Sequence, residues 1–215
     1  GFTTLCEGLD YAAQGQTGMN FYGPRGQLDV SLSYKALRKR AIKTAHRLVN
    51  AGIKPGERVA VVAETGADFM AVFFGCQYAG IVPCPLPYSM YIGGHEAYVS
   101  RVAGMLQSAH ATAVVTTGDL EALVREAAAR ARVAKVWSHE ELAGFEASGA
   151  QLKPFGPDDV SYIQYSSGST SNPKGVLISQ KAACANTMAI LRHGLKITPT
   201  DRAFSWLPLY HDMGL

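Results

Sequence analysis

The chain has 215 residues, of which 47% are hydrophobic and 17% charged, a composition typical of a folded globular domain rather than a disordered segment. The formal net charge is only +3 and the basic residues are scattered, which argues against a nucleic-acid-binding protein. No apolar run approaches the length of a membrane span, and residues 1–10 lack the features of a signal peptide, so we expect a cytoplasmic protein.

The first part of the chain predicts a hairpin followed by a basic helix. The hairpin strands flank a Gly-Pro-Arg-Gly turn at 23–26, within a Gly- and Gln-rich stretch. Ser33 is the expected N-cap of a helix whose apolar residues recur at helical spacing from Leu37 to Leu48, and Gly52 closes it. We expect the basic side chains of this helix to be solvated, because no ladder of aromatic side chains accompanies them.

Strands and helices then alternate along the chain. Strands are predicted at 58–64, 81–84, 113–117 and 134–137, and helices at 67–79, 95–109 and from an Asp119 cap to Arg132. This alternation predicts an α/β fold with a parallel sheet flanked by helices on both faces. A linker at 146–159 is expected to precede strands at 160–165 and 176–178, a helix at 180–193 capped by Ser179, and an apolar strand at 202–207.

The cysteines carry no signal of a redox or metal motif. They show no Cys-x-x-Cys pair and no regular spacing, so we expect reduced thiols that pack as small apolar side chains. They are Cys6, Cys76, Cys84 and Cys184.

The stretch from Tyr165 to Val176 carries the strongest chemical signal. Its sequence, Tyr-Ser-Ser-Gly-Ser-Thr-Ser-Asn-Pro-Lys-Gly-Val, lies between two apolar runs. Glycines let the backbone approach a ligand closely, N–H and hydroxyl groups donate hydrogen bonds, and Lys174 supplies a positive charge. This combination predicts a polyphosphate-binding loop.

Two other interpretations of this loop are weaker. A flexible Ser/Gly hairpin loop is one, but Pro173, Lys174 and Gly175 directly precede an apolar strand and limit its flexibility. A P-loop nucleoside triphosphatase is the other. Its motif ends in Gly-Lys-Ser/Thr and opens a helix, whereas here the order is Lys-Gly and a strand follows.

The loop resembles the signature loop of the adenylate-forming (AMP-binding) superfamily, which includes acyl-CoA synthetases, fatty acyl-AMP ligases, luciferases and the adenylation domains of peptide synthetases. The segments at 32–37 and 78–83 resemble further segments of that family. The Leu-Pro-Leu-Tyr-His-Asp-Met-Gly-Leu run at 207–215 looks most like the fatty acyl-AMP ligase branch. By itself, a histidine in such a turn is more often structural than catalytic.

The resemblance implies roles for individual residues. Lys174 would stabilise the pyrophosphate leaving group and His211 would border the substrate carboxylate, which makes these two the expected catalytic residues. Mg²⁺ would bridge the ATP phosphates without a protein ligand from this chain. The expected ATP-binding residues are Ser166, Ser167, Gly168, Ser169, Thr170, Lys174 and Gly175.

The implied activity is the ATP-dependent conversion of a carboxylic acid, in particular a fatty acid, to an acyl-adenylate with release of pyrophosphate. Acyl transfer to an acyl carrier protein would follow. Coenzyme A as acceptor and a peptide-synthetase adenylation domain remain open, because the features that separate them are encoded beyond Leu215. A nucleotide-binding module without catalysis is the alternative from a different class.

The resemblance covers nearly the whole chain, but members of this family are much longer. Their adenine, ribose and Mg²⁺ ligands and a small C-terminal domain with a catalytic lysine come later. Residues 1–215 are therefore expected to be an N-terminal part of the large AMP-binding domain, with a sub-boundary near 146–159 and the C-terminal domain absent.

Overall fold

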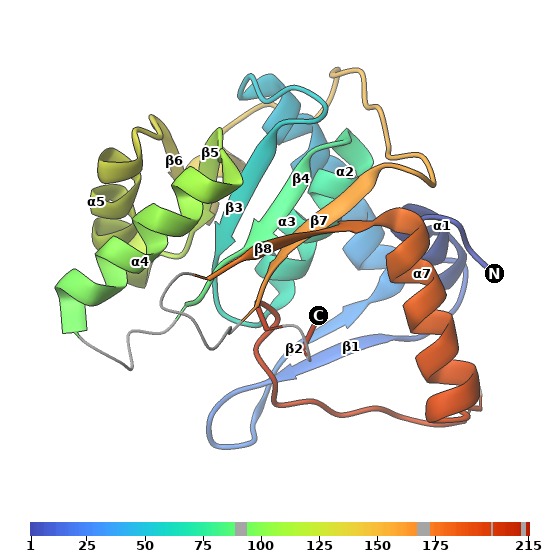
Figure 1. Ribbon diagram of the computed structural model, residues 1–215. Helices are drawn as coiled ribbons and strands as arrows, with labels where there is room; N and C mark the ends of the chain where they lie inside the picture. The colour runs from blue at the N-terminus through green and yellow to red at the C-terminus, as the bar shows by residue number, and fades with distance from the viewer. Residues whose placement is uncertain (89–93, 167–172, 199, 212–213) are drawn as a thin grey trace.

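The computed structural model describes residues 1–88, 94–166, 173–198, 200–211 and 214–215 (Figure 1). Its centre is a parallel sheet with strand order β4-β3-β5-β6. The strands are β3 (Arg58–Val62), β4 (Val82–Pro85), β5 (Ala113–Thr116) and β6 (Lys135–Ser138). Within the described ranges, no helix combines the length and apolar content needed to cross a bilayer. The predicted α/β class with a parallel sheet is confirmed.

Helices cover both faces of this sheet, as predicted. Side chains of a strand alternate between its two faces, so Val59 and Val61 pack with α2 (Tyr34–Asn50) and α3 (Ala67–Ala79). Ala60 and Val62 pack on the other face with α4 (Gly94–Ala109) and α5 (Glu121–Ala131). Figure 1 shows α4 and α5 on one side of the sheet and α2 and α3 on the other.

The start of α2 follows the predicted capping chemistry, and a glycine ends α3. The Ser33 hydroxyl accepts a hydrogen bond from the Ala36 N–H at 3.1 Å. Gly80 ends α3 with a φ of +66°, and a side chain there would place a Cβ 2.3 Å from the Lys153 carbonyl oxygen. Both the left-handed backbone and this close approach require glycine.

Two antiparallel hairpins flank the parallel sheet. β1 (Gly18–Tyr22) and β2 (Leu28–Ser33) form the predicted N-terminal hairpin. β7 (Val160–Tyr165) and β8 (Gly175–Ser179) form the second, and β7 lies beside β4 (Figure 1). The expected strand after the Ser/Gly-rich loop is thus confirmed, and its antiparallel pairing departs from a purely parallel architecture.

Prolines explain why no further strand joins the parallel sheet beside β4. The predicted strand at 81–84 ended one residue earlier than β4, which includes Pro85. The N–H groups of Val82 and Leu86 donate to the carbonyls of Glu57 and Val61, at 2.9 Å each. The N–H groups on this side of the strand therefore hydrogen-bond to β3 and the residues next to it. Pro83 and Pro85 occupy the alternate positions and have no N–H for a strand on the other side. β7 therefore packs against β4 without joining its hydrogen-bonded ladder.

Two short helices and one cap differ from the predictions. α1 (Leu5–Ala12) and α6 (His139–Ala143) were not expected, although each begins with a capping box, at Thr4 and Ser138. Asp119 is not the N-cap of α5; it lies inside a 3₁₀ turn, Gly118–Leu120, that leads into the helix. The predicted cap is therefore wrong by one short turn.

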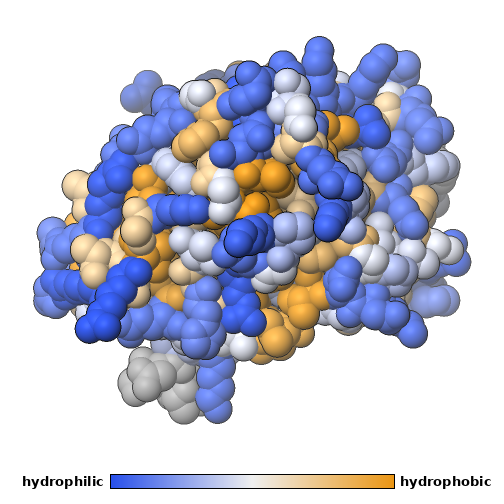
Figure 2. Space-filling model, turned by 90° about the horizontal axis from the view of Figure 1, so that it is seen from above, coloured by the Kyte–Doolittle hydropathy of each residue, from blue (hydrophilic) through white to orange (hydrophobic). Residues whose placement is uncertain are grey.

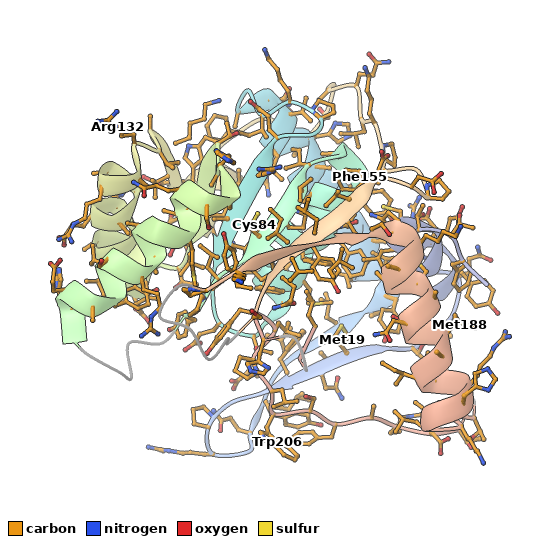
Figure 3. The ribbon with its side chains drawn as sticks, viewed as in Figure 1. Met19, Cys84, Arg132, Phe155, Met188 and Trp206 are labelled. Atoms are coloured by element: carbon orange, nitrogen blue, oxygen red, sulfur yellow. The ribbon has the colours of Figure 1, made fainter. Side chains whose placement is uncertain are left out.

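The apolar strand predicted at 202–207 does not form. No described strand lies beside it to supply hydrogen bonds, and Phe204 and Trp206 are 75% and 83% exposed. Figure 3 shows Trp206 at the periphery of the molecule, whereas Cys84 lies in the sheet. The preceding helix is confirmed over nearly its predicted length, as α7 (Gln180–Ala189) followed by a π-helical turn, Ile190–Gly194. The four cysteines are free and buried, as predicted.

Candidate active site

The Ser/Gly-rich loop is the connection of the β7–β8 hairpin, and its two ends are joined. Tyr165 pairs with Gly175 across the strands, and the Ser166 N–H donates to the Lys174 carbonyl at 3.1 Å. Ser166, Lys174, Gly175 and His211 are described in the structure. The other expected ATP-binding residues, Ser167, Gly168, Ser169 and Thr170, lie outside the described residues.

Tyr165 anchors this neck of the loop to α4. Its hydroxyl donates to the Met105 carbonyl at 2.8 Å and lies 2.5 Å from the Ser108 hydroxyl. Burial raises the pKa of Tyr165, which keeps the phenol protonated and able to donate. Sequence reasoning did not find Met105 or Ser108, because their partner lies 57 or more residues away in the chain.

Gly175 has a packing role directly below the loop. A Cβ at this position would lie 2.9 Å from Ile163 Cγ2 and 3.2 Å from Tyr165 Cζ. These distances are shorter than ordinary carbon contacts. Glycine therefore allows the Tyr165 ring to lie across the first residue of β8.

Lys174 offers a positive charge at the neck of the loop. The residue is exposed, and its ammonium group forms no ion pair with any residue in the described ranges. The parallel strands and β7 all direct their carboxyl ends to this edge of the molecule, where open α/β sheets bind their ligands. The described part of the loop thus leaves a lysine side chain exposed at this edge of the sheet.

The turn at 208–211, which contains His211, lies at the same edge. The Leu209 N–H donates to the Thr65 hydroxyl at 3.1 Å, and the Gln164 side-chain amide donates to the Tyr210 carbonyl at 2.9 Å. Thr65 lies just after β3 and Gln164 is near the end of β7, directly before the loop neck. The structure therefore brings the His211 turn and the Lys174 loop to one edge of the sheet, where Thr65 and Gln164, which were not predicted, hold the turn.

Further polar side chains lie at this edge. Tyr88 follows β4, and its pKa is raised to about 12 by burial and by a hydrogen bond to Glu64. The Tyr98 hydroxyl donates to the Pro87 carbonyl at 3.0 Å. Across the described ranges, no three His, Cys, Asp or Glu side chains come together to hold a metal ion.

The opposite edge, where the parallel strands begin, has a different character. Seen from above, it shows hydrophobic side chains broken up by many hydrophilic ones (Figure 2). A shallow cavity of about 450 Å³ near that edge is lined by residues that include His110, Arg130 and Arg132. Neither Lys174 nor His211 contributes to it.

The chain belongs to the AMP-binding enzyme family, whose description matches residues 12–215. These are adenylate-forming enzymes, which use ATP. A solved structure from a study of fatty acyl-adenylate ligases from E. coli and L. pneumophila superimposes with a TM-score of 0.94 and 41% identity, over 99% of this chain and 38% of that one.

Curated relatives point to acid-activating enzymes. A Caulobacter vibrioides protein with the provisional name of acyl-CoA synthetase is 46% identical over all of this chain and 37% of its own length. The long-chain-fatty-acid–AMP ligase FadD26 of Mycobacterium tuberculosis is 36% identical over 89% of this chain and 33% of its own. The medium-chain-fatty-acid–[acyl-carrier-protein] ligase JamA of Moorena producens is 29% identical over all of this chain and 37% of its own. The chain thus spans about a third of the length of these relatives.

Proposed function

We propose that the whole protein activates a fatty acid with ATP, forming an acyl-adenylate and pyrophosphate, and then transfers the acyl group to an acyl carrier protein. One observation carries the first step. The neck of the Ser/Gly-rich loop, with Lys174 exposed and outside every ion pair of the described ranges, and the turn with His211 lie at one sheet edge, joined through Gln164. This placement supports the proposal of a polyphosphate site at the loop beside a carboxylate site at the turn.

The chemistry asks the protein for positioning and charge stabilisation. A carboxylate oxygen attacks the α-phosphorus of ATP, a new C(O)O–P bond forms, and the bond to the β-phosphate oxygen breaks with release of pyrophosphate. The hydroxyl and N–H groups of 166–170 hold the phosphates, and Lys174 neutralises the charge that grows on the leaving group. His211 borders the carboxylate, and Mg²⁺, when bound with ATP, lowers the repulsion between the phosphates and the attacking anion.

The choice of acceptor rests on the 207–215 run and on the names of relatives. That run looks most like the acyl-AMP ligase branch, FadD26 is named an AMP ligase, and JamA is named a ligase to acyl carrier protein. The name of the Caulobacter relative favours coenzyme A, which makes an acyl-CoA ligase the second candidate. Both share the adenylation step.

The test supplies the full-length protein with ATP, Mg²⁺ and a labelled fatty acid, and then offers each acceptor separately. We expect fatty-acid-dependent exchange of pyrophosphate into ATP, and labelled carrier protein in preference to acyl-CoA. Rapid formation of acyl-CoA with no loading of the carrier protein would replace the first candidate by the second. An absence of exchange with every chain length would refute adenylation of fatty acids itself.

A further inference from the structure

Alternate side chains of β7 point to two different hydrophobic clusters. The side chains of Ile163 and Tyr165 join the hydrophobic cluster formed with α4 and α5. Tyr162 packs against the cluster of α2 and α3, as does Leu209 of the turn. Because side chains alternate along a strand, Gln164 projects to the same side as Tyr162, which is where the turn docks.

The turn is fastened by backbone hydrogen bonds to side chains of two strand ends. Thr65 accepts from the Leu209 N–H at 3.1 Å, and Gln164 donates to the Tyr210 carbonyl at 2.9 Å. A third bond is internal, from the His211 N–H to the Pro208 carbonyl at 3.0 Å. His211 therefore directly follows two residues whose backbone positions depend on Thr65 and Gln164.

Gln164 holds the turn by a shorter hydrogen bond than it makes to the loop neck. Its residue is only 8% exposed, and its amide also lies 3.4 Å from the Tyr165 carbonyl oxygen. The neck is held by different groups, namely the backbone pair of Ser166 and Lys174 and the hydroxyl of Tyr165. Loss of the Gln164 amide removes a tether of the turn and leaves these bonds in place.

On the basis of the function proposed above, we propose that Gln164 and Thr65 are positioning residues that set where His211 lies relative to the phosphate loop. Their contribution is to the carboxylate half of the reaction, since both hydrogen-bond to the turn that carries His211. A misplacement of about 1 Å in a reacting geometry can lower the rate roughly 100-fold. A single neutral hydrogen bond far from the chemistry has a much smaller effect.

The main variant is Gln164→Met in the full-length protein, which keeps the length of the side chain and removes the donor. We expect kcat for fatty-acid-dependent pyrophosphate exchange to fall about tenfold or more, while the KM for ATP changes less than about twofold. Thr65→Val should act in the same direction. The double variant should fall by less than the product of the single effects, because both act on one turn.

Gln107→Met is the matched control. Gln107 on α4 likewise donates from its side-chain amide to a backbone carbonyl of another element, that of Arg130 at 3.3 Å, but it lines the cavity near the opposite edge. This variant should keep wild-type kinetics. If Gln164→Met and Gln107→Met are equally active, the inference is overturned.

Hydrogen exchange provides a readout that does not depend on activity. In Gln164→Met, amides of 207–211 should exchange at least about tenfold faster, whereas β8 should exchange as in the wild type. Unchanged exchange at 207–211 would overturn the inference even if the rate falls. If the wild-type protein activates no fatty acid, the proposed function fails, and the exchange comparison alone then decides whether Gln164 positions the turn.

Discussion

Gly75 on α3 gives a stability prediction whose sign can be worked out from the packing. A Cβ at this position would lie 2.9 Å from Thr44 Cβ and Cγ2 and 3.2 Å from the Ala41 carbonyl oxygen on α2. Since carbon atoms normally contact at about 3.5–4.0 Å, the two helices must separate by about 0.6 Å or more. Replacing glycine by alanine in a helix stabilises by roughly 0.5–1 kcal/mol, whereas overpacking costs about 1–3 kcal/mol.

We therefore expect Gly75→Ala to lower the free energy of unfolding by about 1–2 kcal/mol. Gly104 in α4 is the control, because a Cβ there meets nothing within 4 Å, so Gly104→Ala should raise stability by about 0.5–1 kcal/mol. Urea unfolding of both variants, followed by circular dichroism, measures the two midpoints. Equal stabilisation by both substitutions would show that α2 and α3 do not pack as closely as described.

Three further results are expected. Lys174→Ala in the full-length protein should raise the barrier to acyl-adenylate formation by about 2–4 kcal/mol with little change in fatty acid affinity, and an unchanged kcat in an acyl-hydroxamate assay would remove Lys174 from the mechanism. Burial lowers the pKa of His139, so on acidification the unfolded chain binds a proton before the folded chain does. The difference in unfolding free energy between wild type and His139→Gln should therefore be largest above about pH 7 and shrink toward pH 5, and urea titrations in which both proteins show the same pH dependence would contradict this. Burial raises the pKa of Cys84 to about 12, so iodoacetamide at pH 8 should label this thiol only after denaturation, as mass spectrometry of native and unfolded samples can check.

Local sequence patterns predicted most of the fold, because hydrophobic periodicity, helix caps and glycine positions indicated the same elements. Periodicity, caps and terminal glycines agree for the helix that begins after Ser33 and for the buried helix at 67–79. The strands around the second helix follow from the same patterns. α1 and α6 were missed although Thr4 and Ser138 begin capping boxes, because short helices have little periodicity. The segment at 202–207 has the composition of a strand, but a strand also needs a neighbour, and composition carries no information about that.

The part of the candidate site that consists of consecutive residues could be predicted from the sequence. Lys174 and its neighbours form a motif, and the structure places Ser166, Lys174 and Gly175 at the neck of one loop. Thr65 and Gln164 were not predicted. Each is a common polar residue that gains its role from a contact 46 or more residues away in the chain.

The proline pattern of β4 has a mechanical consequence. Because Pro83 and Pro85 remove the donors that face β7, the β7–β8 hairpin meets the parallel sheet through side chains, without a shared ladder. Sliding along such a boundary breaks no backbone hydrogen bond between the two sheets, whereas sliding between β3 and β4 would break a row of them. What fixes the hairpin that carries Lys174 against the parallel sheet is therefore side-chain bonding, such as the Tyr165 hydroxyl to the Met105 carbonyl at 2.8 Å and the Gln77 amide to the Ser161 carbonyl at 2.8 Å.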